Sequence, residues 1–324
     1  MRIIFLGQKQ LKIFIIGLIC IIFISGIIVN RERIARQAFG VKQGVRLEGQ
    51  LLQGLLPDEV ASVVKVLAEK VSREPRNACY YGETGEIIPA EAGKAVNIAI
   101  NVRRVFTAKP GTNLDLLISE VTPDISEDYF KPVYHGKEDS PRAALAINVA
   151  WGEEYLGEIL KTLRSEKVKA TFFFVGTWVK AFPEMVRTIA ADGHEVANHG
   201  LYHGHPEQMG QEELRKLILE NTSLLTSIVG KKPVNLFAPP YGELNAQIVR
   251  VAGQLGYRTI MWSVDSIDWK NPAPEVLLDR VLSKVKPGGI ILLHPTISTK
   301  ESLPILIKSL RKRGLEPGTV SSVL

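Results

Sequence analysis

Side chains that can bind a cation or transfer a proton recur in the second half of the chain, each time directly after a short apolar run. His199 and His203 stand four residues apart. Two imidazoles at that spacing can reach one cation if the loop between them coils into a helical turn, although such a pair alone is more typical of surface histidines. Asp265 and Asp268 follow a second apolar run, and His294, the only histidine after residue 205, ends a third.

The apolar runs that precede these side chains have the composition of buried β-strands. From Arg142 onward they alternate with segments whose apolar residues have helical spacing. Repeated strand-then-helix units with nearly continuous apolar strands predict a parallel sheet covered by helices. The expected strands are 145–149, 171–175, 195–198, 235–238, 259–264 and 290–293, the expected helices are 153–165, 183–191, 212–229, 244–255 and 274–285, and the pair 303–311 and 319–323 closes the series.

Six or seven such units in about 180 residues predict a small, irregular (β/α) barrel rather than a complete eight-unit barrel. In these barrels the chemistry lies where the parallel strands end, and the polar side chains follow the strands as this rule requires. The fourth expected strand is followed by the rigid turn Ala238-Pro239-Pro240-Tyr241-Gly242. We expect this turn to present backbone N–H groups to the mouth of the barrel.

Four motifs in residues 142–324 together resemble those of the NodB-type polysaccharide deacetylases, metal-dependent enzymes that remove acetyl groups from chitin-like or peptidoglycan sugars. The motifs are His-x-x-x-His at 199–203, Pro-Pro-Tyr-Gly at 239–242, Asp-x-x-Asp-Trp at 265–269 and Ile-x-Leu-x-His at 290–294. The resemblance implies an α/β fold of the distorted (β/α)7, TIM-like barrel type. Trp151-Gly152 after the first strand is similar to the membrane-anchored, sporulation-associated branch found in endospore-forming bacteria.

The same resemblance implies a role for each motif at its own positions. It implies a divalent, zinc-like metal held by His199 and His203. The implied catalytic residues are His294 as the general acid, Asp268 as the carboxylate that orients it, and Tyr241 through its oxyanion-stabilising backbone. The implied substrate pocket comprises the acetyl-pocket wall of Trp269 and Leu292, together with Asn148 and Pro240.

The first motif departs from the family pattern, in which Phe-Asp-Asp-Gly supplies a catalytic base and a metal ligand. Asn148 stands at the position of the base, and an amide has no useful basicity near neutral pH. Val149 stands at the position of the carboxylate ligand, and Ala238 replaces the arginine that pairs with the base. The joint loss is physically consistent, because a buried arginine without its carboxylate would be an uncompensated charge. We therefore predict that catalytic activity is reduced or lost.

Two further acids follow the altered motif. Glu153 or Glu154 could reach the metal in place of the lost aspartate. Because both residues begin an expected helix, we favour the alternative that they serve its N-terminal dipole. Without a substitute the metal would be held weakly, since a catalytic zinc normally has three protein ligands.

The N-terminal region contains 17 residues without a charge, from Ile13 to Val29. This length is at the lower limit for a helix that crosses about 30 Å of hydrocarbon. A buried soluble helix and a cleaved signal peptide are the alternatives, and no typical cleavage site follows the run. We expect an uncleaved, single-pass membrane anchor over residues 1–30. Basic residues are more numerous after the run than before it, which by the positive-inside rule favours a cytoplasmic main part.

Composition divides the remainder of the chain into four segments. We expect a stalk at 31–45, a small α+β domain at 46–123, a linker at 124–141 and the barrel domain at 142–324. The small domain is similar to wall-associated modules proposed to bind peptidoglycan, and a spacer without a ligand is the alternative. Of the net charge of +6, three charges lie in or before the N-terminal apolar stretch, and the remaining charge of about +3 is too weak and too dispersed to indicate a nucleic-acid partner.

These observations favour two classes of function. The first is a de-N-acetylase with reduced activity that acts on peptidoglycan or another N-acetylated glycan of the cell wall or spore cortex. The alternative is a non-catalytic glycan-binding or scaffold protein of the envelope, which Asn148 favours because its amide keeps the shape of a carboxylate without its basicity. A purely structural membrane protein would explain neither His294 nor Asp268. Because both favoured classes act on glycan, we expect the main part of the chain to lie outside the cytoplasm, against the charge rule.

Overall fold

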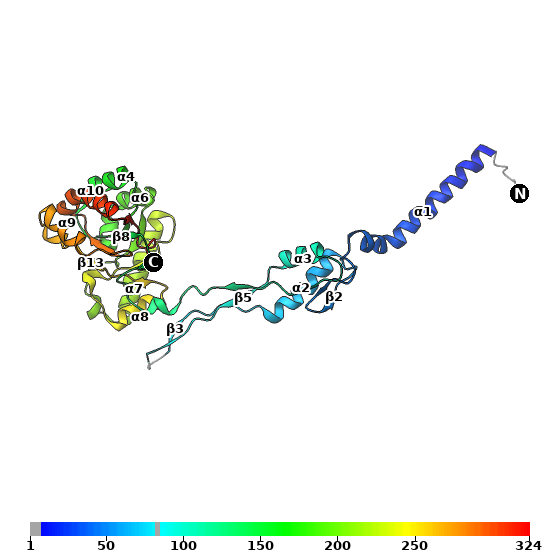
Figure 1. Ribbon diagram of the computed structural model, residues 1–324, viewed down its shortest axis with the longest axis horizontal. Coiled ribbons are helices and arrows are strands. Elements are labelled where there is room, and N and C mark those ends of the chain that lie inside the picture. Colours follow the sequence, from blue (N-terminus) through cyan, green and yellow to red (C-terminus); the bar gives the residue numbers. More distant parts are fainter. Residues whose placement is uncertain (1–7, 82–84) are drawn as a thin grey trace. The chain divides into compact units, whose positions relative to one another are not determined.

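The computed structural model describes residues 8–81 and 85–324, without the side chains of 8–15, 22, 24–25 and 27–29. The chain forms two compact units, which Figure 1 colours along the sequence. One unit comprises residues up to Arg76 together with Glu91–Pro123, and the other comprises Asn77–Ala90 together with Asp124–Leu324. The domain boundaries expected from composition stay predictions.

The first unit is a small α+β fold with an aliphatic core that includes Leu47, Val60 and Val105. Helices α2 (Pro57–Val71) and α3 (Ile98–Thr107) pack on each other. The helix α1 (Gln8–Phe39) precedes them, and the strands are β1 (Arg46–Leu47), β2 (Gln50–Leu51), β5 (Gly93–Ala95), β6 (Asn113–Leu114) and β7 (Ser119–Val121). One sheet has the order β2-β1-β6, and β5 pairs antiparallel with β7.

Within the described residues, no helix is long and apolar enough to cross a membrane. The structure therefore does not support the transmembrane helix expected at the N-terminus. Residues 1–7 of the expected anchor lie outside the described part of the chain.

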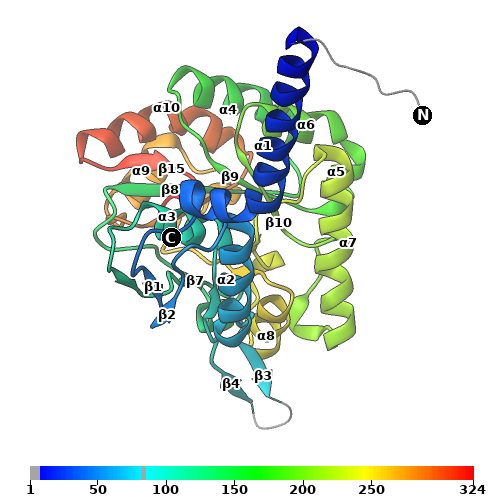
Figure 2. The same ribbon diagram turned by 90° about the vertical axis from the view of Figure 1, so that its right-hand side faces the viewer.

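The second unit is built on a curled parallel sheet with the strand order β12-β11-β10-β9-β8-β14-β13, and β15 pairs with the start of β8. Helices surround this half-barrel, as Figure 2 shows. The strands are β8 (Arg142–Val149), β9 (Thr171–Phe174), β10 (Glu195–Asn198), β11 (Leu236–Phe237), β12 (Arg258–Thr259), β13 (Val264–Asp265), β14 (Ile290–Leu293) and β15 (Glu316–Gly318). The helices are α4 (Glu153–Ser165), α5 (Gly176–Ala181), α6 (Pro183–Ala191), α7 (Gln211–Val229), α8 (Ala246–Gln254), α9 (Pro274–Leu282) and α10 (Ile297–Lys312). The predicted α/β class with a barrel-like parallel sheet is confirmed.

A two-stranded hairpin, β3 (Cys79–Tyr81) with β4 (Glu86–Ile88), also belongs to the second unit. The ring of Tyr80 lies 6.0 Å from that of Phe130, and the Arg250 guanidinium lies 5.4 Å from the centre of the Tyr80 ring. These contacts attach the hairpin to the outside of the barrel next to α8.

The two faces of β8 have different environments, which decides where its side chains can act. Ile147 and Val149 belong to the apolar layer beneath the helices, whereas Ala144 and Ala146 belong to the cluster inside the curled sheet. Because successive strand residues point to opposite faces, Asn148 continues the inner series. The strand therefore directs Asn148 into the barrel.

The expected strand at 259–264 is wrong in one respect, since it is two strands at opposite ends of the sheet order. Between β12 and β13 the chain leaves the sheet, and the Met261 N–H donates to the Val133 carbonyl oxygen at 2.8 Å. The run is mostly apolar, so its composition resembles a single strand although its middle pairs with a distant segment. The last strand also differs, because β15 precedes the expected segment 319–323.

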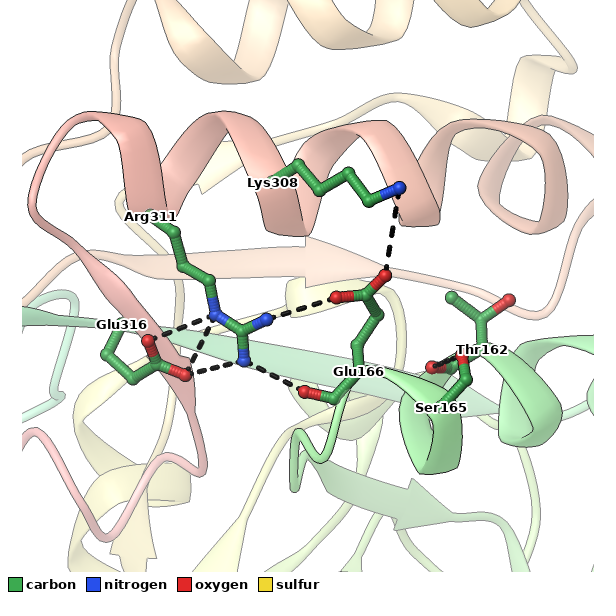
Figure 3. Close-up of polar contacts among 6 residues, drawn as sticks. All are labelled: Thr162, Ser165, Glu166, Lys308, Arg311 and Glu316. Atoms are coloured by element: carbon green, nitrogen blue, oxygen red, sulfur yellow. Dashed lines mark hydrogen bonds and ion pairs between the residues drawn. The ribbon is translucent and has the colours of Figure 1, made fainter.

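Arg311 of α10 fastens the last strand to the helical layer, as Figure 3 shows. Its Nη1 and Nη2 donate to the side chain and the carbonyl oxygen of Glu166, at 3.0 Å and 2.9 Å. Nη2 also donates to Glu316 of β15 at 2.8 Å. A planar guanidinium with several donors suits this shared position better than an ammonium would, because its donors form a fixed fork.

Candidate active site

Polar and aromatic side chains converge where β8, β10, β13 and β14 end. They border an open cavity of about 710 Å³. The lining consists of Asn148, Ala150, Trp151, His199, His203, Tyr241, Gly242, Trp262, Asp265, Trp269, Leu292 and His294. The structure thus brings together seven of the nine site residues predicted from the sequence. The other two, Pro240 and Asp268, are buried and do not line the cavity.

Asp268 lies behind His294 and fixes the orientation of its ring. The His294 Nδ1 donates to Asp268 Oδ1 at 2.8 Å, and the His294 backbone N–H donates to Oδ2 at 2.5 Å. The Thr299 hydroxyl donates to the same Oδ2. With Nδ1 bound in this way, Nε2 is the ring nitrogen left to exchange a proton with a ligand, which is the arrangement of a histidine general acid.

His199 and His203 come together as predicted, with their ring centres 5.3 Å apart. The His199 Nδ1 donates to the Ala238 carbonyl oxygen at 2.7 Å. Burial lowers the pKa of His199 to about 3, and burial followed by the charge of His294 lowers the pKa of His203. Both imidazoles are therefore neutral near pH 7, the form in which histidine binds metals.

The donor set does not fit the zinc site that the family resemblance implies. Among the described residues no group of three or more His, Cys, Asp and Glu side chains could hold a metal ion. Val149, at the position of the expected carboxylate ligand, is fully buried in the apolar layer. Glu153 and Glu154 are exposed in the first turn of α4 and do not line the cavity, in agreement with their serving the helix dipole. Two imidazoles alone fall short of the three ligands of a catalytic zinc.

Asn148 occupies the position of the missing base, and only 5% of its surface is exposed. Its Oδ1 is buried without a hydrogen-bond partner in the described structure. Ala238, at the position of the missing arginine, is buried and apolar. The base half of the site therefore contains neither a proton acceptor of useful basicity nor a cation to support one.

Aromatic rings form much of the remaining wall. Trp151 stacks on His294, with ring centres 5.2 Å apart and planes 16° apart, and meets His203 edge-on at 6.4 Å. Three of the four tryptophans of the chain, Trp151, Trp262 and Trp269, line the cavity. The motifs had indicated only Trp269 as a pocket residue. Trp262 was missed because it stands inside the run 259–264, which was expected to be a single strand, and Asp265 was noted as an acid after that run but was not assigned to the pocket.

Tyr241 has a strained backbone at the cavity rim. It lies in the short turn Pro240–Gly242 with φ 59° and ψ 0°, the left-handed region that non-glycine residues rarely adopt. Its ring meets His203 edge-on at 4.2 Å and stacks on His205 at 4.5 Å. The His205 ring is in turn hydrogen-bonded to Glu243 at 2.6 Å. These contacts hold the turn in the conformation that presents its backbone to the cavity.

Comparisons with known proteins agree with this site. Residues 135–260 match the family model described as polysaccharide deacetylase. The chain is 36% identical over 253 residues to the Bacillus subtilis protein YlxY, which is described as uncharacterized, and the match covers 78% of this chain and 79% of that protein. It is 34% identical over 176 residues to a peptidoglycan-N-acetylglucosamine deacetylase of Bacillus cereus, covering 52% of this chain and 82% of the relative.

Solved structures give the same result. A CE4 family pseudoenzyme from Bacillus anthracis shares 33% identity and a TM-score of 0.59, and the match covers 82% of this chain and 94% of the other. A mutant of that pseudoenzyme, described as having restored enzymatic activity, matches with 32% identity, the same TM-score and coverage of 82% and 97%. From the curled parallel sheet, the residues at its strand ends and these matches, we conclude that the chain belongs to the polysaccharide deacetylase family, carbohydrate esterase family 4.

Proposed function

We propose that the protein binds amino-sugar glycan of the cell wall in the cavity at the strand ends, and that its hydrolysis of N-acetyl groups is reduced or lost. The observation that carries this proposal is the amide of Asn148 at the position of the base, together with the lack, among the described residues, of a third metal ligand beside His199 and His203. Relatives of the chain include deacetylases of peptidoglycan N-acetylglucosamine, which supports a glycan of this class.

The expected loss of rate is large even if the cavity binds its glycan well. General base catalysis contributes typically ~10²–10⁴-fold, and Asn148 cannot supply it. No other described residue that lines the cavity places a carboxylate at the level of Asn148 in the sheet. We assign no metal-dependent step, because the two imidazoles do not make a complete zinc site. His294, oriented by Asp268, remains able to donate a proton to a leaving group.

A non-catalytic glycan-binding or scaffold protein is the second candidate. The exposed aromatic rings favour it, because a cavity with aromatic walls and a few convergent polar groups is typical of a ligand site whether or not chemistry follows. The two candidates share the ligand and differ only in turnover.

We also propose that the main part of the chain lies outside the cytoplasmic membrane, since the glycan of its relatives lies there. Membrane attachment through the apolar run 13–29 and a link to sporulation remain part of this proposal. A reporter that is active only outside the membrane, fused after Leu324, tests it. Activity of a cytoplasmic reporter at the same position, with silence of the first, would defeat the localisation.

The function is tested by measuring glycan binding and acetate release by the purified full-length protein. The substrates are N-acetylglucosamine oligomers and peptidoglycan, with and without added zinc, and the control is His294→Ala. We expect binding with acetate release at or near background. Release at the rate of an active relative, abolished in the control, would show that another group replaces the base. Failure of the folded protein to bind either glycan would refute the proposed function.

A further inference from the structure

The lining of the cavity has an unusual charge balance. The twelve described residues that line it include one carboxylate, that of Asp265, and neither lysine nor arginine. Asp265 Oδ1 accepts the Ile267 backbone N–H at 2.8 Å. A carboxylate has about four lone-pair sites, so this single bond leaves most of its accepting capacity for a ligand. The cavity therefore favours a ligand group that is positively charged and donates hydrogen bonds.

The strand register places Asp265 deep in the cavity. Asp265 is paired with Leu292 of β14, and Leu292 is paired with Ala146 of β8. Asn148 and His294 stand two residues further along their strands, which at about 3.3 Å per residue puts them some 7 Å nearer the mouth. A sugar substituent that reaches past His294 consequently meets the Asp265 carboxylate at the level of Leu292.

Two further features suit a cationic sugar in this cavity. The Asn148 Oδ1, nearer the mouth, has no hydrogen-bond partner among the described residues, so it can turn toward a donor of the ligand without losing a bond. Trp151, Trp262 and Trp269 surround the space, and the faces of indole rings attract cations. One ammonium already uses such a face from outside the cavity, since Lys270 Nζ lies 4.9 Å from the centre of the Trp269 ring.

From these observations we propose that the cavity selects amino sugars whose 2-amino group is free and protonated, so that the preferred glycan is already de-N-acetylated. The inference rests on the proposed glycan-binding function and names the form of the sugar. The ammonium donates to Asp265, while the sugar rings lie against the tryptophans. A charge-assisted hydrogen bond of this kind is stronger than a neutral one. An acetyl methyl group at the same depth would instead face a carboxylate.

The test compares glucosamine oligomers with N-acetylglucosamine oligomers of equal length, titrated into the full-length protein at matched ionic strength. A chelator is present so that trace zinc does not occupy the imidazoles. Tryptophan fluorescence reports binding directly, because three of the four tryptophans line the cavity. We expect the glucosamine oligomer to bind about tenfold more tightly or better, the scale expected for one hydrogen bond to a charged group. Unspecific attraction of a polycation is disfavoured by the net charge of +6.

The matched variants are Asp265→Asn and Asp279→Asn. The first removes the charge and keeps an oxygen that can accept the Ile267 N–H, and the second removes an equal charge from the exposed side of α9. We expect Asp265→Asn to abolish the preference for the free amine and Asp279→Asn to leave it unchanged.

Three outcomes would overturn the inference. Equal or tighter binding of the N-acetylated oligomer would remove the preference and leave the proposed function intact. A preference for glucosamine that persists in Asp265→Asn would refute the role of that carboxylate. Absence of binding by either oligomer, with peptidoglycan also unbound, would refute the proposed function and the inference together.

Discussion

His194 makes the stability of the barrel dependent on pH, although it lies outside the candidate active site. It stands immediately before β10 with 6% of its surface exposed. Its Nδ1 accepts the Ala170 backbone N–H at 3.1 Å, and its ring meets Phe172 edge-on at 5.1 Å. Nδ1 must keep its lone pair to accept that bond, so the folded protein requires the neutral imidazole with its proton on Nε2. Protonation of Nδ1 would break the bond inside the core.

The size of the effect follows from the pKa. Burial, and secondly the charge of Lys169, lowers the pKa of His194 from 6.5 to about 4. Between these values the unfolded chain binds more protons than the folded one, so the free energy of unfolding falls as the pH decreases from about 6.5 towards 4. At pH 5 the loss relative to pH 7.5 amounts to about 2 kcal/mol at most. Salt reduces it, because the Lys169 charge is at the surface.

The variant that tests this is His194→Asn, whose Oδ1 can accept the Ala170 N–H in place of Nδ1. Urea denaturation at pH 7.5 and pH 5.0 gives the free energy of unfolding of both proteins. We expect the wild type to lose about 2 kcal/mol more than the variant between these pH values, because His199 and all other groups contribute equally to both. The control Ile189→Val should lower stability by about 1 kcal/mol at both pH values. An equal pH-dependent loss in the wild type and His194→Asn would refute the reasoning.

Four further changes test the fold and the altered site. Arg311→Ala removes the donors to two glutamates, and urea denaturation should show that the free energy of unfolding falls by about 1–2 kcal/mol. Arg311→Lys should restore less than half of this loss. Gly152→Ala should lower the free energy of unfolding by more than about 2 kcal/mol, because φ is 80° and the added Cβ would overlap a backbone carbonyl oxygen. An unchanged Tm would contradict this prediction. Val149→Asp buries a carboxylate and should lower the free energy of unfolding by roughly 3 kcal/mol when zinc is absent. Added zinc should raise the Tm of this variant, because the new carboxylate completes a set of three ligands. A Tm that does not change with zinc would show that the side chain stays in the apolar layer. Adding Asn148→Asp and Ala238→Arg to that variant should raise acetate release about 10²-fold or more, and no gain would mean that the cavity has changed beyond its base.

The sequence predicts best where a buried run has clear ends. The helices at 153–165 and 183–191 and the strands at 195–198 and 290–293 have the expected limits in the structure. Each begins or ends beside glycine, proline or a polar residue, which are local signals. The segment 259–264 lacks such a signal in its middle, where a backbone pairing with Val133 interrupts the sheet. A pairing between residues so far apart leaves no trace in local composition.

The candidate site was predictable in part for the same reason. Motif residues that follow strands are brought together by the parallel sheet itself, so His199, His203 and His294 meet as expected. The motifs do not reveal how the side chains pack, and this packing decides which of them face the cavity. Trp151 turns over His294, while Asp268 is covered by that histidine and does not line the cavity.

The acid half of the site survives and the base half is lost for a structural reason. Asp268 has no exposed surface, and its carboxylate accepts hydrogen bonds from the backbone and ring of His294 and from Thr299 of α10. Without it three buried donors would lose their acceptor, at a cost of roughly 1–3 kcal/mol for each group left unpaired. The Asn148 Oδ1 has no hydrogen-bond partner among the described residues, so no donor of the fold depends on the side chain at this position. The fold preserves the acid half whether or not catalysis occurs, and the pair His294–Asp268 is therefore no evidence of turnover.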